Sequence, residues 1–460
     1  MKKSFIVLGA AAMVAAAAVP ALALENEFHG MYRLRGNMTN FQAAGAVTTG
    51  AGSDQKRTYT LFEQRARLQY TAKANADLKL VTHFEIDSTW GDAAYNNGRG
   101  TGAGLAGDSV NLETKNLFID FNVPSSPVNM KVGLQPFTDA YKGLFISDDV
   151  AGAVATGKFG PATAQAAFLR TYDGNGANPL GKKNVDIYVL DGKFSPTKDL
   201  TVGASYYLAN NDVRYSGQAL HVVGLNAAAN LGIVGVDGAF LYQAGDELYA
   251  ASGKDLSAYA AQVAAKVNLG AVAVRAAGLY ASGDDGKDAK KSTAFQNIFA
   301  SGPLPTQPIP TSTTPASAAV AAQAAAGSST SSGVYYSSNM LMLLRSVYAM
   351  DSDQSLVASI NNGGKGLMAG FTGVDAKISD KLSASANAGF AWVSEKAASD
   401  KGKYIGTELN LALNYALYAN LTATAQGGYV MLGEYFDGKA GTGKNPKDPY
   451  LAGIMMNYSF

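Results

Sequence analysis

Apolar and polar residues alternate with a period of two along most of this chain, in segments of about ten residues. In the segment 27–39, Phe28, Tyr32 and Met38 share one face, whereas Arg33 and Arg35 lie on the other. A period of two indicates a β-strand, and about ten residues is the length of a tilted strand that crosses a membrane. The pattern therefore predicts a chain built from membrane-spanning strands.

Counting these segments predicts about 18 strands, and 16 is the alternative because Ala and Gly occupy both faces of some middle segments. The predicted strands are 27–39, 61–73, 78–87, 112–122, 128–135, 151–159, 162–172, 184–194, 200–210, 219–230, 234–244, 256–268, 271–281, 366–378, 382–394, 403–417, 421–433 and 450–460.

The connections between these segments alternate between short and long. Short ones such as 73–77 and 379–381 are followed by longer, Gly- and Asp-rich ones such as 90–110 and 434–449. Short periplasmic turns and long external loops are typical of outer-membrane barrels. The longest connection, 283–365, has a low-complexity centre followed by the apolar run VYYSSNMLMLLRSVYAM. We interpret this run as a surface loop, or as a segment that folds over the barrel mouth or into a neighbouring subunit.

Residues 1–23 have the features of a secretory signal peptide. Lys2 and Lys3 precede an apolar stretch, and Ala21-Leu22-Ala23 forms an A-x-A cleavage site. We expect an exported protein whose mature chain, residues 24–460, forms the barrel. No later stretch is apolar over the roughly 18 residues that a membrane-spanning helix needs.

The composition argues against several other classes of protein. The chain has 37 Lys and Arg against 36 Asp and Glu, and removal of the signal peptide leaves a net charge of about −1, which does not favour a nucleic-acid partner. The absence of cysteine excludes disulfides, thiolate metal sites and covalent haem attachment. There are three histidines and no Ser–His–acid constellation, so we expect no catalytic residue, cofactor or metal site.

In a membrane barrel the apolar face of each strand meets lipid, and the polar face lines the lumen. The charged residues of these strands must point inward, because charge on the lipid face is costly. Barrels of 16–18 strands leave an aqueous channel, and the first strand begins too early to leave room for a plug domain. The predicted fold is therefore all-β, a transmembrane antiparallel up-and-down barrel.

Three stretches resemble those of Gram-negative outer-membrane porins: FHGMYRLRGN in the first strand, VNMKVGLQPFTDAYKGLFISDDVAGA from residue 128, and the terminal YLAGIMMNYSF. The resemblance implies a homotrimeric channel of the cell outer membrane, surrounded by lipid and lipopolysaccharide. It also implies that the third external loop, residues 136–150, is an infolded constriction loop that narrows the barrel. The connection 283–365 departs from the compact loops of common porins, which argues against simply transferring their selectivity.

A candidate constriction follows from strand parity. Two arginines on the first strand and two on the second share the inward face, and acidic residues lie on the second and third strands and on the third loop. The pore-lining candidates are Arg33, Arg35, Glu63, Arg65, Arg67, Glu85, Asp87, Asp139, Asp148 and Asp149. Charged walls set ion selectivity in narrow pores, so the arginines are expected to favour anions. The alternative is that these charges pair with one another and only solvate the wall.

The chain ends on an amphipathic strand with Tyr458 on its apolar face and the bare aromatic Phe460 as its last residue. We expect this strand to pair with the first one, because a closed barrel leaves no strand edge open in lipid. Tyr458 and Phe460 also resemble the signal that the barrel-assembly machinery recognises.

The sequence leaves two functions open. One is a porin for passive diffusion of small hydrophilic solutes and ions, and the other is a substrate-selective channel for anions, sugars or organic acids. An outer-membrane enzyme or a sleeve around a cytochrome is not favoured, because the chain lacks the residues that either would need.

Overall fold

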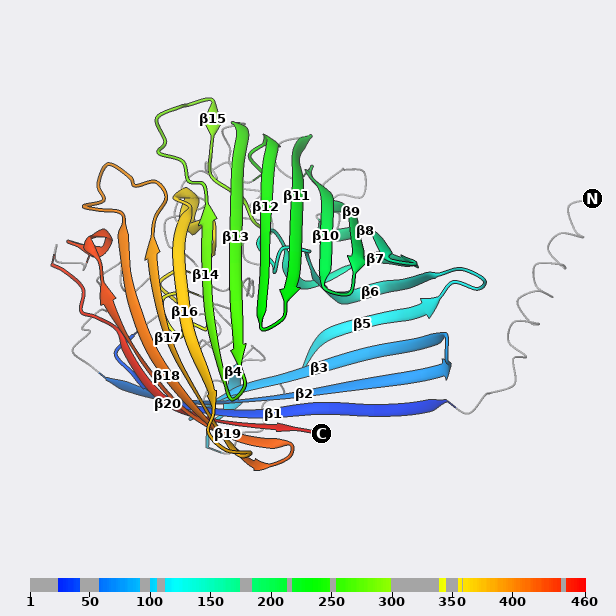
Figure 1. Cartoon of the computed structure of the whole chain (residues 1–460), viewed down its shortest axis with the longest axis horizontal. Coiled ribbons are helices and arrows are strands. Elements are labelled where there is room, and N and C mark those ends of the chain that lie inside the picture. The colour runs from blue at the N-terminus through cyan, green and yellow to red at the C-terminus, as the bar shows by residue number, and fades with distance from the viewer. Residues whose placement is uncertain are drawn as a thin grey trace, which may run out of the picture.

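The computed structural model describes residues 24–41, 58–91, 100–105, 112–173, 184–212, 217–248, 254–298, 339–344, 355–357, 359–439 and 444–460. The predicted signal peptide, residues 1–23, lies outside these ranges. All strands belong to one sheet, whose long strands pair in chain order and close on themselves (Figure 1). Among the described residues, no helix is long and apolar enough to span a membrane.

Eighteen long antiparallel strands form the wall of the barrel, which confirms the predicted fold and the higher of the two predicted counts. They are β1 (Glu25–Thr39), β2 (Tyr59–Asn75), β3 (Leu78–Trp90), β5 (Glu113–Asn122), β6 (Val128–Thr138), β7 (Ser147–Phe159), β8 (Ala162–Asp173), β9 (Asn184–Thr197), β10 (Leu200–Asn211), β11 (Gln218–Leu231), β12 (Val234–Asp246), β13 (Asp255–Leu269), β14 (Val272–Ala281), β16 (Leu367–Lys377), β17 (Leu382–Trp392), β18 (Tyr404–Tyr418), β19 (Leu421–Leu432) and β20 (Tyr450–Ser459).

Four short elements lie in the connections. The strand β4 (Gly100–Ala103) pairs in parallel with β3, and β15 (Lys291–Ser292) pairs in parallel with β13. The 3₁₀ turn η2 (Asn362–Gly364) precedes β16, and the 3₁₀ turn η3 (Glu434–Phe436) follows β19. The long connections all lie at the same end of the barrel, because short turns join the strands at the other end.

The first and last strands close the barrel, and Figure 1 shows β1 in blue beside β20 in red. Their register pairs Met31 with Ser459 and Thr39 with Leu451. Beyond β20, the backbone N–H of Phe460 donates to the Gly30 carbonyl at 3.0 Å, and the Gly30 N–H donates to the Phe460 carbonyl at 2.8 Å. A side chain at Gly30 would collide with the Phe460 ring, so the glycine provides the space that the terminal residue occupies.

The outer face of the barrel is apolar, as the alternation predicts. Phe28, Leu190, Val263 and Ile454 are 59–61% exposed and share the outward parity of their strands. Such exposure of large apolar side chains all around a protein is explained by a lipid environment.

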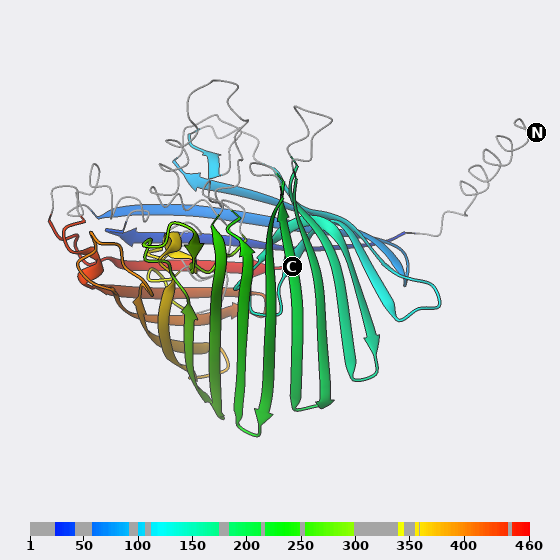
Figure 2. The same cartoon turned by 90° about the horizontal axis from the view of Figure 1, so that it is seen from above.

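Two connections at the long-loop end fold back into the barrel. We call residues 139–146, between β6 and β7, the third loop, and residues 339–344, within the connection from β14 to β16, the inserted segment. The side chains of both are almost all buried, and both pack against inward-facing residues of the wall. In Figure 2 the yellow residues shortly before β16 lie within the outline of the barrel.

The inserted segment is the described part of the apolar run after the low-complexity stretch, and the rest of that run lies outside the described residues. Met340 contacts the inner face of β17, where Gly389 leaves room for its side chain, and Leu341 and Met342 approach Gly428 of β19. The segment is thus neither a surface loop nor a contact with a neighbouring subunit, because its apolar side chains occupy the lumen of its own barrel.

The seam between β1 and β20 generates a prediction about Phe460. Deleting this residue removes two backbone hydrogen bonds, each contributing about 0.5–1.5 kcal/mol, together with the ring that covers Gly30. We expect less of the chain to reach the folded, heat-modifiable form on a denaturing gel, with normal conductance in the fraction that inserts.

The matched control is Phe159→Ala, which truncates an outward-facing Phe of the same 53% exposure away from the seam. It should leave the folded fraction near that of the unchanged chain. Equal folded fractions for the deletion and the control would contradict the role of Phe460.

Candidate functional site

The four arginines of β1 and β2 lie on the inner wall, as their parity predicts. Arg33 stands opposite Arg65 and Arg35 opposite Glu63 across the pair of β1 and β2. On the next pair, Arg65 stands opposite Asp87, and Arg67 opposite Glu85. Direct cross-strand neighbours lie within reach of each other, so this register brings all seven predicted side chains of β1–β3 together.

Three of these arginines form ion pairs along the wall. Arg65 binds Asp87 through two bonds, from Nε to Oδ1 and from Nη2 to Oδ2, each 2.6 Å long. Arg35 pairs with Glu63, and Arg67 pairs with Glu85. The prediction that the charges neutralise one another therefore holds for these three arginines.

Arg33 differs from the other three. In the part of the chain that the structure describes, it has no ion-pair or hydrogen-bond partner, and its electrostatic neighbours include Arg35 and Arg65. Its side chain is partly exposed. Four arginines against Glu63, Glu85 and Asp87 leave one positive charge in excess on β1–β3, and Arg33 is the arginine of this group without a paired acid among the described residues.

The third loop is shorter than the predicted 136–150, and it is organised by Asp139. The Asp139 carboxylate accepts hydrogen bonds from the backbone N–H groups of Tyr141, Gly143, Phe145 and Ile146 at 2.7–2.9 Å. Burial raises the pKa of the Asp139 carboxyl, whereas these four donors favour its ionised form. At 6% exposure, Asp139 holds the loop in shape and does not line the water-filled lumen.

The third loop reaches the wall formed by β10–β12. The Tyr141 ring packs where Gly224 leaves space, and the Phe145 ring lies 5.5 Å from that of Tyr207. Burial raises the pKa of Tyr141 to about 12. The tip residue Lys142, whose φ is 62°, forms an ion pair of 2.5 Å with Asp237 of β12. The expectation of an infolded third loop agrees with this arrangement.

Asp148 and Asp149 lie on β7 and not in the infolded loop. Asp149 binds the side chains of Lys115 and Asn116, the latter at 2.7 Å. The Asp149 carboxylate is thus bound by side chains of β5. The prediction that Asp148 and Asp149 lie on the infolded third loop is wrong, because both belong to β7.

Sequence reasoning missed the residue that holds the inserted segment. Glu408 on β18 is fully buried, and its carboxylate accepts hydrogen bonds from the backbone N–H groups of Leu341, Met342 and Leu343. Asn410 donates to the Asn339 carbonyl at 2.9 Å and to Glu408 at 2.7 Å. The inward parity of Glu408 could be read from the sequence, but its partners, more than sixty positions away, could not.

Toward the long-loop end, an apolar core occupies the lumen on the side opposite the arginines. Inward residues such as Ile187, Tyr207, Val222 and Leu241 are fully buried against the third loop and the segments before β16. The arginine wall on β1–β3 stays polar. The two inserted elements therefore narrow the lumen asymmetrically and leave the charged wall facing the remaining space.

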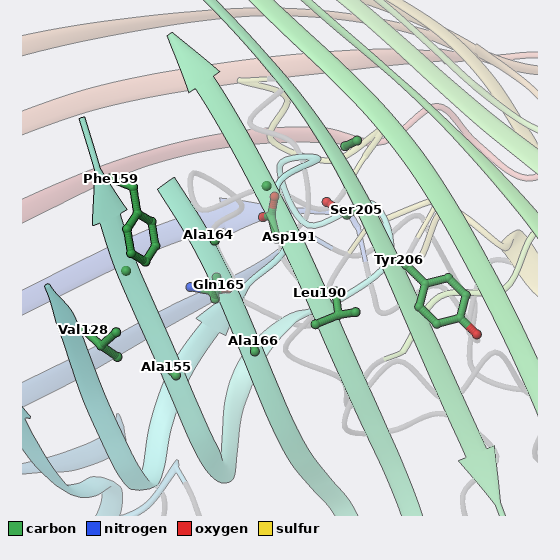
Figure 3. Close-up of a pocket in the computed structure, with 13 residues that line it drawn as sticks. Val128, Ala155, Phe159, Ala164, Gln165, Ala166, Leu190, Asp191, Ser205 and Tyr206 are labelled. Atoms are coloured by element: carbon green, nitrogen blue, oxygen red, sulfur yellow. The ribbon is translucent and has the colours of Figure 1, made fainter. Parts of the chain in front are cut away.

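One hollow lies on the outer surface and not in the lumen. Figure 3 shows it across β6–β10, where small residues such as Ala155 and Ala166 lie among Phe159, Leu190 and Tyr206. The three large side chains are 37–60% exposed and have outward parity, so this hollow faces lipid. No group of three or more His, Asp or Glu side chains within the described ranges is arranged to hold a metal ion.

The comparisons with known proteins concern the fold. No protein-family model matches the chain, and no curated protein does either. Among solved structures, Pseudomonas aeruginosa OpdO matches with a TM-score of 0.54 and 14% identity, over 94% of this chain and 97% of that one. The chain has the fold of an outer-membrane channel.

Two further matches were solved with small molecules. Pseudomonas aeruginosa OccK2 (OpdF) in complex with glucuronate has a TM-score of 0.54 and 10% identity, over 95% of this chain and 96% of that one. Pseudomonas aeruginosa OpdK with vanillate has a TM-score of 0.52 and 10% identity, over 94% and 98%. At these identities the likeness establishes the shared barrel architecture and no residue-by-residue correspondence.

The contacts of Glu408 generate a prediction about the inserted segment. Replacing Glu408 with Ala leaves three buried N–H groups without their acceptor, each costing about 1–3 kcal/mol. We expect residues 339–344 to leave their place on the inner wall, so that single-channel conductance in a planar bilayer increases.

Glu395→Ala serves as the control, because Glu395 is a 42% exposed acid at the long-loop end that pairs with Lys403. It should leave conductance unchanged. If Glu408→Ala gives the conductance of the unchanged channel while remaining heat-modifiable on a gel, Glu408 does not hold the segment in the lumen.

Proposed function

We propose that this protein is a substrate-selective outer-membrane channel for small organic anions, above all carboxylates. The observation that carries the proposal is the guanidinium of Arg33, which has no partner among the described residues, in a wall where Arg35, Arg65 and Arg67 are each paired with an acid. This arrangement favours a substrate-selective channel over a general porin for passive diffusion. The homotrimer, the contact with lipopolysaccharide and recognition by the barrel-assembly machinery stay predictions.

The physical basis is the chemistry of the guanidinium. Arginine remains charged at any physiological pH, and its planar donors match the two oxygens of a carboxylate. The ion pairs around Arg33 fix its neighbours, so a solute meets a cation that no described acid neutralises, in an ordered wall. Selective pores need binding that attracts the solute without retaining it, which a single, partly exposed charge provides.

The narrowing of the lumen supports selectivity over simple sieving. The third loop and the inserted segment are held by buried carboxylates, each with three or more backbone donors. Such organised loops give the narrowed lumen a defined shape. Two proteins of the same architecture were solved with glucuronate and vanillate, both of which carry a carboxylate, and this agrees with the proposal.

Substitution of Arg33 tests the proposal. Arg33→Gln removes the excess positive charge, and we expect the ratio of anion to cation permeability, from the reversal potential in a KCl gradient, to fall about two- to fivefold. This corresponds to roughly 0.5–1 kcal/mol for a partly exposed charge. Arg33→Lys keeps the charge and should retain most of the anion preference.

A double variant controls for changes in the wall that leave its net charge intact. Arg65→Gln combined with Asp87→Asn removes one ion pair and should move the reversal potential much less than Arg33→Gln does. An unchanged reversal potential in Arg33→Gln would overturn the assignment of anion selectivity to this residue.

A further inference from the structure

A second group of cations lies across the barrel from the arginine wall. A cavity of about 460 Å³ opens on the inner face of β11–β16, with the tip of the third loop above it. Lys142, Lys266 and Arg275 line the cavity, and Asp237 is the one acid among its lining residues. The cavity is thus positively charged although it lies far around the wall from β1–β3.

The three cations of the cavity differ in their partners. Lys142 binds Asp237 at 2.5 Å, and Arg275 binds Asp375 through two bonds of 2.7 and 2.9 Å. Lys266 stands directly opposite Arg275 in the register of β13 and β14. It is exposed, and among the residues that the structure describes it has no ion-pair or hydrogen-bond partner.

Most of the remaining lining of the cavity is apolar, with Asn230 and Thr372 as its neutral polar residues. Phe371 of β16 and the alanines Ala228, Ala264 and Ala277 contribute to it, all with inward parity. Small side chains next to one aromatic ring leave space for a flat or compact apolar group. A cation beside an apolar surface is the arrangement that binds a carboxylate attached to a hydrocarbon group.

A strained turn at the tip of the third loop fixes the position of Lys142. Lys142 and Gly143 have φ values of 62° and 79°, and a positive φ is uncommon for a residue other than glycine. Asp139 holds the turn in this conformation through its four backbone donors. The roof of the cavity is therefore preorganised and not a chance contact of a mobile loop.

We infer that this cavity is a second solute-binding subsite, which takes a small organic anion with its carboxylate at Lys266 and its apolar group against Phe371. The inference rests on the proposed function, because it assumes that organic anions enter the channel. Arg33 would attract the anion from one wall, and the cavity would bind it at the other.

Block of the ion current by benzoate tests this inference in planar bilayers. Benzoate combines a carboxylate with a ring, benzyl alcohol has the ring without the charge, and acetate has the charge without the ring. We expect benzoate to reduce the current at a lower concentration than acetate does, and benzyl alcohol to have no such effect.

Lys266→Gln is the decisive variant. Removing an exposed cation that binds a carboxylate should raise the half-blocking benzoate concentration about five- to tenfold. Lys266→Arg should restore block to within about twofold of the unchanged channel, because it keeps the charge. Lys193→Gln is the matched control, since Lys193 is also an exposed, inward-facing lysine near a short-turn end, but lies outside the cavity.

The outcomes separate this inference from the proposed function. If benzoate blocks the unchanged channel and Lys266→Gln is blocked equally well, the subsite is overturned while anion selectivity stands. If Lys266→Gln and Lys193→Gln weaken block to the same degree, the effect is one of general charge, and the subsite is again overturned. If carboxylates fail to block and the unchanged channel shows no anion preference, the proposed function fails first.

Discussion

The structure depends on one constraint: inside a lipid bilayer, water is not available to pair with backbone N–H and C=O groups. A chain that crosses the bilayer as strands must therefore close into a barrel, in which each strand edge is paired. Here the closure is made by β1 and β20 and extends to Phe460, whose backbone exchanges two hydrogen bonds with Gly30. Closure also decides the direction of the side chains, because apolar residues then face lipid and charges face the lumen. The arginines of β1 and β2 are inside for this reason.

Two buried carboxylates shape the interior that closure creates. Asp139 accepts four backbone N–H groups of the third loop, and Glu408 accepts three from the inserted segment. A buried charge is unfavourable unless it is fully hydrogen-bonded, so each carboxylate is stable only while its loop stays in place. Asp139, a candidate for the solute-facing eyelet, instead holds the third loop, and Glu408 holds the inserted segment. Among the described residues, Arg33 on the arginine wall and Lys266 in the opposite cavity have no ion-pair partner.

Much of the fold follows from local sequence. The period of two located all 18 strands of the wall, and parity placed Arg33, Arg35, Arg65 and Arg67 inside. The roles of single acids did not follow, because they depend on contacts that no local pattern records. Asp139 is buried, Asp149 binds β5 from β7, and Glu408 meets a segment more than sixty residues away in the chain. One signal was present: Ile187, Val222 and Leu241 are apolar although their parity is inward, and they pack against the inserted elements.

The most direct test of an anion-selective channel compares two solutes that differ in one charged group. Glucuronate and glucose share a sugar ring, and glucuronate carries a carboxylate where glucose carries a neutral CH₂OH group. In a liposome swelling assay with the purified, folded protein, the account predicts faster entry of glucuronate than of glucose. Entry of glucose at an equal or higher rate would contradict it.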